Sequence, residues 1–252
     1  MKRSFRESLR GLSGKVRTVL AETVWPEQSL CVCCRKVLRP FDIAIQPDLP
    51  DTALCLDCRE TLDKELLEKE NTVTKLLFTD VLSVFAYGGK ARDLVLALKH
   101  GTVSAAAEPL VYYAADLAKR ELKLPPETVV TWVTMPASRR RERCIDHGKA
   151  LAEGIAKELG LPCRQLLIRS EGGHTQQGLN AEERKKNVSG RFTTVEGKMP
   201  ESVLLVDDVL TTGSTIDECG KMLRKAGVGQ ITAVTVCAVR RMRSADRKGP
   251  RA

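Results

Sequence analysis

Two adjacent acids and a cluster of hydroxyl side chains stand between an apolar run and an amphipathic segment in the last quarter of the chain. The acids are Asp207 and Asp208, and the hydroxyl cluster follows as Thr211-Thr212-Gly213-Ser214-Thr215. The unalternated apolar run 203–206 predicts a strand buried on both faces, and 215–225 predicts a helix. A helix N-terminus offers unpaired N–H groups and a positive dipole, so the loop between them is predicted to hold a phosphate.

The two acids indicate what accompanies that phosphate. Ionised carboxylates only accept hydrogen bonds, and the vicinal hydroxyls of a polyol donate them, so a ribose 5-phosphate fits Asp207 and Asp208. The loop lacks the Lys of G-x-x-x-x-G-K-[ST], which excludes a Walker loop. A capped helix with two solvated acids is the alternative structural interpretation.

Four cysteines near the front have the spacing of a metal site. They form two C-x2-C pairs with twenty residues between the pairs: Cys31, Cys34, Cys55 and Cys58. This spacing is typical of a zinc ribbon, and four sulfur ligands close the coordination shell, which predicts about one structural Zn²⁺ per chain. A segment of about 45 residues buries little core, so metal binding would supply folding free energy on the order of 10 kcal/mol. Cys33 competes as a ligand with Cys31 and Cys34.

A third feature follows a predicted strand at 129–133. The turn Pro136-Ala137-Ser138-Arg139 leads into further arginines at 140, 141 and 143. Guanidinium groups bind phosphate oxygens in a bidentate fork, so this turn is a candidate diphosphate site. A solvated basic patch ahead of a helix is the alternative.

Strands and helices alternate from residue 81 onward. Strands are predicted at 81–85, 129–133, 203–206 and 231–236, and helices at 91–99, 105–122, 148–159 and 215–225. Such alternation predicts a parallel sheet flanked by helices. We therefore expect an amphipathic basic helix at 1–25, the zinc ribbon at 26–75, an α/β domain at 76–239 and a disordered basic tail at 240–252. The first helix is expected to dock on the protein body, with a membrane surface or an organellar presequence as alternatives.

Composition excludes several classes of protein. The chain has 252 residues, a net charge of +9, 42% hydrophobic residues and 4% aromatic residues. These values exclude wholesale disorder, and the absence of an apolar run of about 18 residues argues against a spanning helix. Few aromatics argue against a surface built to stack many bases, while the positive charge favours phosphate or nucleic-acid partners. Without a signal-like segment, a cytoplasmic location is expected.

The motif around Asp207 and Asp208 resembles the phosphoribosyl-pyrophosphate (PRPP) motif of type I phosphoribosyltransferases, and with the four cysteines the chain resembles the ComF family of bacterial competence proteins. The resemblance implies a type I phosphoribosyltransferase fold preceded by the zinc ribbon. It implies that Asp207 and Asp208 hold the ribose hydroxyls, that residues 211–215 surround the 5-phosphate, and that Mg²⁺ accompanies PRPP.

The resemblance extends to two loops. Residues 136–139 match the family's pyrophosphate turn, although Cys144-Ile145-Asp146 stands where the family has Gly-Phe-Asn. The segment from His174 to 188 resembles the mobile hood that closes over PRPP, with Gln177 and Arg184 as candidate contacts.

Three functions are compatible with these patterns. The first is a ComF-like PRPP-binding protein that acts in DNA uptake or handles single-stranded DNA, partnered by the uptake machinery. The second is a metabolic phosphoribosyltransferase of nucleotide synthesis or salvage. The third is a catalytically inert, zinc-dependent nucleic-acid adaptor. No residue specifies an acceptor, so whether the chain retains catalysis stays open at this point.

Overall fold

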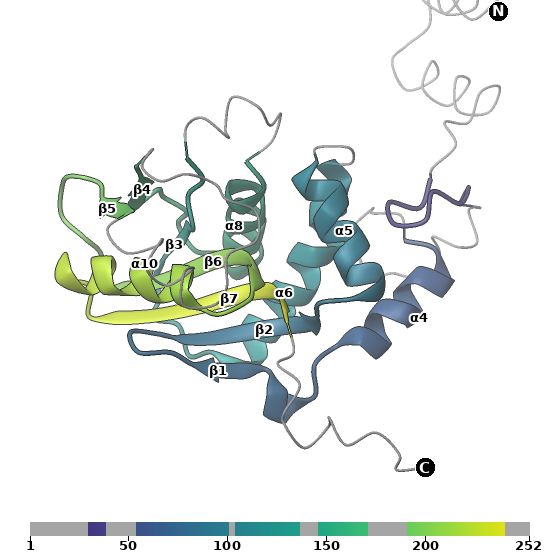
Figure 1. Ribbon diagram of the computed structural model, residues 1–252, viewed down its shortest axis with the longest axis horizontal. Coiled ribbons are helices and arrows are strands. Elements are labelled where there is room, and N and C mark those ends of the chain that lie inside the picture. The colour runs from purple at the N-terminus through teal and green to yellow at the C-terminus, as the bar shows by residue number, and fades with distance from the viewer. Residues whose placement is uncertain (1–29, 39–53, 101–103, 137–145, 171–190, 240–252) are drawn as a thin grey trace, which may run out of the picture.

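The computed structural model describes residues 30–38, 54–100, 104–136, 146–170 and 191–239. The predicted basic helix at 1–25 and the predicted tail at 240–252 lie outside these residues. Within them, a central sheet is covered by helices on both faces (Figure 1). No helix of the described ranges is both long enough and apolar enough to cross a bilayer.

The central sheet has five strands in the order β1-β2-β7-β6-β3. Their bounds are Val73–Lys75, Asp80–Ala86, Gln230–Ala238, Ser202–Leu210 and Val129–Trp132 in that order. Four strands are parallel, and β1 pairs antiparallel with β2 at one edge. Strands β2, β3 and most of β6 and β7 are buried apolar runs, as expected when helices cover both faces of a parallel sheet.

Three helices cover one face of the sheet: α5 (Gly89–Lys99), α6 (Ala107–Glu121) and α8 (His147–Leu159). Their apolar sides bury residues such as Leu94, Leu110 and Ile155 against Leu204 and Val234 of the sheet. The opposite face is covered by α10 (Ser214–Lys225) and by a small hairpin of β4 (Leu167–Arg169) and β5 (Phe192–Thr194).

The cysteine-rich front end packs into the same core as the helices. Helix α4 (Leu56–Glu65) buries Cys58 and Leu62, and these residues share one apolar cluster with Ala91 and Leu94 of α5. Short 3-10 turns, Lys69–Asn71 and Ser104–Ala106, complete the described elements. The predicted α/β fold with a parallel sheet is confirmed, with β1 as its one antiparallel strand among the described residues. The division into units at residue 76 stays a prediction.

The predicted elements match the structure closely except at β6. The strand was expected to end at Val206, but it continues to Leu210 because Asp207, Val209 and Leu210 still pair with β7. Both acids therefore belong to the strand, and the loop before α10 is shorter than expected.

Candidate functional site

The carboxyl ends of the parallel strands form one edge of the sheet. At this edge β6 carries Asp207 and Asp208, and β3 is followed by Pro136. Ligands of open α/β sheets bind outside this edge. The sheet thus brings together the β6 acids, the loop before α10 and the start of the proposed diphosphate turn.

The two acids leave β6 on opposite sides. Successive side chains of a strand alternate between its faces. Asp208 lies on the face of α5 and α8, where it contacts Lys99 and His147, and Asp207 lies toward Cys219 of α10 and Arg169 of β4. The pair thus spans the edge from one helical layer to the other.

Two basic side chains contact a single oxygen of Asp208. Lys99 Nζ and His147 Nε2 each lie 2.9 Å from Asp208 Oδ2. Lys99 is the last residue of α5 and His147 the first residue of α8. Burial raises the pKa of Asp208, but the hydrogen bond from His147 and the charge of Lys99 outweigh it and hold that pKa below its ordinary value. Asp208 is therefore an ionised acceptor at neutral pH.

Asp207 has the opposite character. Burial and the neighbouring charge of Asp208 raise the pKa of Asp207 from 3.8 to about 8. Its side chain accepts a hydrogen bond from the backbone N–H of Asp208 over 3.0 Å, and Arg169 and Lys99 only partly offset the repulsion. In the free protein the two adjacent acids therefore carry close to one negative charge.

The loop between β6 and α10 is shaped by Gly213. Gly213 has a left-handed φ of +78°, which favours glycine, and a Cβ at this position would lie 2.6 Å from Leu76 Cδ2, so the Leu76 side chain would have to move. Thr212 Oγ1 lies 2.8 Å from Ser214 Oγ, and Thr211 is exposed. Gly213 precedes α10 and has no side chain to cap it, and Thr212 Oγ1 accepts from the Ser214 N–H over a long 3.4 Å, a contact that an anion at this helix N-terminus can replace.

The turn between β1 and β2 supports this loop from below. Leu76 packs beneath Gly213, and the backbone N–H of Phe78 donates to Asp217 Oδ1 over 2.9 Å. Asp217 lies in the first turn of α10, so this bond fixes the helix N-terminus against the edge of the sheet. Thr215 is half-buried in the same first turn.

The strand β3 leads to the proposed diphosphate turn. Pro136 is half-buried, while Ala137, Ser138 and Arg139 lie outside the described residues, as do Gln177 and Arg184 of the predicted hood. Just before Pro136, Thr134 is 1% exposed, and its Oγ1 finds no hydrogen-bond partner among the described residues. A buried hydroxyl without a partner at this edge indicates a place for a polar ligand or water.

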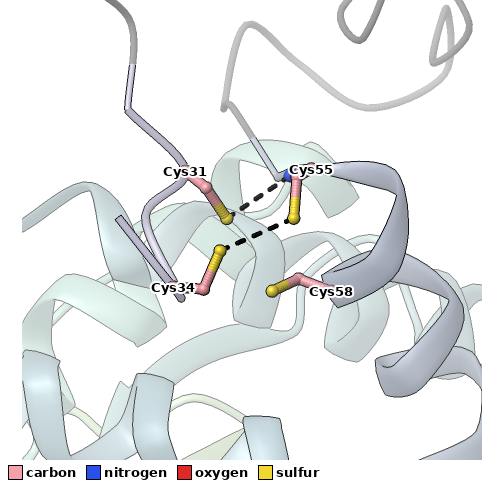
Figure 2. A group of neighbouring side chains, drawn as sticks. All are labelled: Cys31, Cys34, Cys55 and Cys58. Carbon is pink, nitrogen blue, oxygen red and sulfur yellow. Dashed lines mark hydrogen bonds between the residues drawn. The ribbon is translucent and has the colours of Figure 1, made fainter. Parts of the chain in front are cut away.

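The four predicted cysteine ligands meet in space. The sulfur atoms of Cys31, Cys34, Cys55 and Cys58 all lie within 4.8 Å of one another, and Figure 2 shows them pointing toward a common centre. Zn–S bonds of about 2.3 Å in a tetrahedron separate sulfurs by about 3.8 Å. The 3.6 Å between the sulfurs of Cys34 and Cys55 is close to that value. The cluster therefore fits a tetrahedral metal of the size of zinc.

The local backbone structure brings the four cysteines together and favours the thiolate of Cys31. The two pairs come from a tight turn after Leu30 and from the start of α4, and the backbone N–H of Cys55 donates to Cys31 Sγ over 3.3 Å. Although burial disfavours the thiolate, such N–H donors lower the pKa of Cys31 to about 7. Cys33, the competing ligand of the sequence analysis, is not a member of the group of four, and burial raises its pKa to about 11.

A separate pocket of about 300 Å³ lies between α4 and α6, away from the β6 acids. Its rim mixes Arg59 and Arg120 with Asp63 and Asp116, and Tyr113 donates to Asp63. This balanced rim selects no charge, and we assign the pocket no role in the site.

Sequence analysis missed Lys99 and His147 as partners of Asp208. A lysine at a helix C-terminus is explained by the helix dipole alone, so the sequence did not indicate that Lys99 contacts Asp208. His147 lies at the first position of α8, directly after the N-cap Asp146, and nothing in the local pattern indicated its contact with Asp208.

Comparisons with known proteins find similarity to a phosphoribosyl transferase domain and to proteins named for competence and DNA utilization. Residues 144–251 match the family model described as a phosphoribosyl transferase domain. Competence protein F of Haemophilus influenzae is 36% identical over 128 residues, which is 48% of this chain and 55% of that protein. The chain thus aligns with about half of that relative's length. DNA utilization protein YhgH of Salmonella typhi is 27% identical over 230 residues, 90% of this chain and 96% of that protein.

Solved structures are more distant. An allosteric regulatory enzyme of purine biosynthesis has a TM-score of 0.38 at 20% identity, covering 56% of this chain and 30% of the other. Adenine phosphoribosyltransferase of Leishmania tarentolae has a TM-score of 0.36 at 14% identity, covering 66% of this chain and 94% of the other. At these scores the likeness carries no argument about the site.

Proposed function

We propose that this chain, a homologue of Competence protein F and of the YhgH DNA utilization proteins with a phosphoribosyl transferase domain, binds PRPP together with Mg²⁺ at the carboxyl edge of its sheet. We further propose that it acts inside the cell in the uptake or handling of DNA, as the names of these relatives suggest.

The observation that carries the proposal is the sequence of groups along the end of β6. Asp208 is ionised, and its Oδ2 is already oriented by Lys99 and His147. Asp207, one residue earlier, lies on the other side of the strand, and Gly213, with its left-handed φ, precedes the N-terminus of α10 a few residues further on. Carboxylates that accept from ribose hydroxyls, followed by N–H groups that donate to a 5-phosphate, match the order of groups in a phosphorylated ribose.

The diphosphate of PRPP requires positive charge beyond β3. Arg139, in the turn outside the described residues, is the proposed guanidinium donor, and the unpartnered hydroxyl of Thr134 supports a polar group at this end. Mg²⁺ prefers oxygen ligands, and it would add Lewis-acid neutralisation of diphosphate oxygens when bound. Gln177 and Arg184 stay proposed contacts of the hood.

The chemistry open to such a site is displacement at C1 of the ribose. The lone pair of an acceptor forms a bond to C1 while the C1–O bond breaks, and its electron pair leaves with pyrophosphate. In this proposal the ionised Asp208 stabilises the positive charge that develops on the ribose, and Asp207 adds to this stabilisation once it has lost its proton. Since this step needs no covalent intermediate on the protein, the chain needs no activated nucleophile.

We propose that the cysteine cluster holds one structural Zn²⁺. Four thiolates close the coordination shell and leave no position for a substrate, so this metal supplies folding free energy and no chemistry.

The PRPP site is tested by isothermal titration calorimetry with and without Mg²⁺. We expect saturable binding with Mg²⁺, weakened about tenfold to a hundredfold in Asp208→Asn, since hydrogen bonds to charged groups contribute about 1.5–3 kcal/mol each. The loss in Asp207→Asn should be smaller at neutral pH, because Asp207 is mostly protonated in the free protein. Asp80→Asn, an exposed acid at the opposite end of the sheet, is the control and should bind normally. Absence of binding to the wild-type protein refutes the proposal.

The role in DNA handling is tested separately. We expect binding of single-stranded DNA that weakens steeply with salt, as counterion release requires. Loss of residues 240–252 should reduce this binding, because they are rich in Arg and Lys. Release of pyrophosphate with a nucleobase, amine or ammonia, without any DNA binding, would instead favour a metabolic transferase.

A further inference from the structure

Helix α5 runs from the cysteine-rich front end to the candidate PRPP site. At its N-terminal end it receives the side chain of Glu65 from α4, and at its C-terminal end it presents Lys99 to Asp208. We propose that Glu65 is a positioning residue that acts through α5 on Asp208, so that metal binding at the cysteine cluster and PRPP binding at β6 strengthen each other. This inference rests on the proposed function.

Glu65 contacts the N-terminus of α5 through two hydrogen bonds. The backbone N–H of Lys90 donates to Glu65 Oε1 and that of Ala91 to Glu65 Oε2, each over 2.8 Å. These N–H groups have no partner within their own helix, and a carboxylate at a helix N-terminus is also favoured by the dipole. Both oxygens of Glu65 are thus committed to the first turn of α5.

Glycine at position 89 makes room for this contact. Gly89 has a φ of +44°, and a Cβ there would lie 1.9 Å from Glu65 Oε1, far inside any real contact distance. Every other residue type would displace the carboxylate. Glycine at position 89 costs conformational entropy at the start of a helix, and it leaves room for the Glu65 carboxylate.

The position of Glu65 depends on the cysteine cluster. Cys55 precedes α4, Cys58 lies in its first turn, and Glu65 ends it. Cys58, Leu62 and Glu65 follow the spacing of one helical face, and Cys58 and Leu62 bury that face in the core that includes α5. Figure 1 shows α4 and α5 next to each other, and a metal that holds Cys55 and Cys58 therefore fixes the helix that carries Glu65.

The C-terminal end of α5 connects the contact with Glu65 to Asp208. The eleven residues of α5 span about 16 Å, and Leu94 and Leu98 hold the helix in the core on the way. A packed helix moves as a rigid element, so a displacement at Lys90 reaches Lys99. Because Lys99 Nζ lies 2.9 Å from Asp208 Oδ2, helix α5 connects the cysteine cluster to the proposed ribose site.

Thermodynamic linkage supplies the test. If metal tightens PRPP binding, PRPP must tighten metal binding by the same factor, and couplings of this kind lie between about 5- and 150-fold. Zinc affinity is measured by competition with a chromophoric chelator, with and without PRPP and Mg²⁺. PRPP affinity is measured by calorimetry on the zinc-loaded full-length chain, for the wild type, Glu65→Gln, Glu65→Ala and the exposed α4 control Glu60→Ala.

We expect PRPP to raise the zinc affinity of the wild type and of Glu60→Ala at least fivefold, and expect this linkage to vanish in Glu65→Ala. Glu65→Gln keeps one acceptor oxygen and should retain part of it. Wild-type protein that binds PRPP with no change in zinc affinity, or that binds PRPP but no zinc, overturns the inference and leaves the proposed PRPP site standing. An unchanged linkage in a folded Glu65→Ala protein overturns it too. Wild-type protein that binds no PRPP refutes the proposed function itself.

Discussion

Lys99 Nζ, at the end of α5, lies 2.9 Å from Asp208 Oδ2, near the end of β6, although more than a hundred residues separate them in sequence. The pair joins the helical layer to the acidic strand at the edge where we propose PRPP binds. Lys99 therefore contributes both to folding and to the charge state of the site.

The first prediction concerns this pair. Lys99→Met removes the ammonium group that contacts a mostly buried carboxylate, so the free energy of unfolding should fall by about 1–3 kcal/mol in urea titrations. Lys119→Met is the matched control, because Lys119 pairs with Glu158 at the surface and such pairs contribute about 0–1 kcal/mol. Equal losses in the two variants would show that the Lys99 pair has no special role.

The second prediction concerns the pH dependence of stability. The folded-state pKa of Asp207 is raised from 3.8 to about 8, so the folded protein holds this proton more tightly than the unfolded chain. Its contribution to stability is complete below about pH 4 and is lost as the pH rises toward 8. Asp207→Asn should remove this loss of stability with rising pH. Without PRPP, the variant should therefore be more stable than the wild type at pH 8.5 in thermal unfolding. The stabilised variant should nevertheless bind PRPP more weakly. A steeper decline in Asp207→Asn than in the wild type would contradict the assignment.

The third prediction separates the two demands on Gly213. Gly213→Ala introduces both backbone strain and a Cβ that clashes with Leu76, so it should weaken PRPP binding and lower stability by more than about 1 kcal/mol. Gly227→Ala is the control, since Gly227 also has a positive φ but nothing within 4 Å of its Cβ position. Strain alone should lower its stability without changing PRPP binding. Loss of PRPP affinity in both variants would argue against a local role of Gly213.

The fourth prediction concerns the metal. Elemental analysis of the purified chain should find about one zinc per molecule, retained in Cys33→Ser and lost in Cys58→Ser. Removal of zinc by a chelator should lower the thermal midpoint, because a metal bound by the four cysteines would supply folding free energy. Zinc retained in Cys58→Ser but lost in Cys33→Ser would transfer the ligand role to Cys33.

Local patterns predicted the elements that bury whole apolar faces. The helices α5, α6, α8 and α10 and the strands β2, β3, β6 and β7 all lie where periodicity placed them. Helix α4 was missed because its run is rich in Asp, Glu, Lys and Arg and buries only Cys58 and Leu62. The three-residue strands β1, β4 and β5 are too short to show a period.

The site was predictable where its chemistry is contiguous in sequence. Asp207, Asp208 and the loop to Thr215 follow one another, and the spacing of the cysteines is local within each pair. The basic side chains that contact Asp208 could not be predicted in this way, since Lys99 and His147 come from two different helices and meet only in the folded chain. For the same reason the contact of Glu65 with the start of α5 leaves no mark on the sequence pattern.

The most direct measurement is a crystal structure of the zinc-loaded chain with PRPP and Mg²⁺. We predict electron density for the 5-phosphate over the backbone N–H groups at 213–215 and for ribose hydroxyls within hydrogen-bond distance of Asp207 and Asp208. Density for the ligand at any other place, or none at saturating PRPP, would contradict the account.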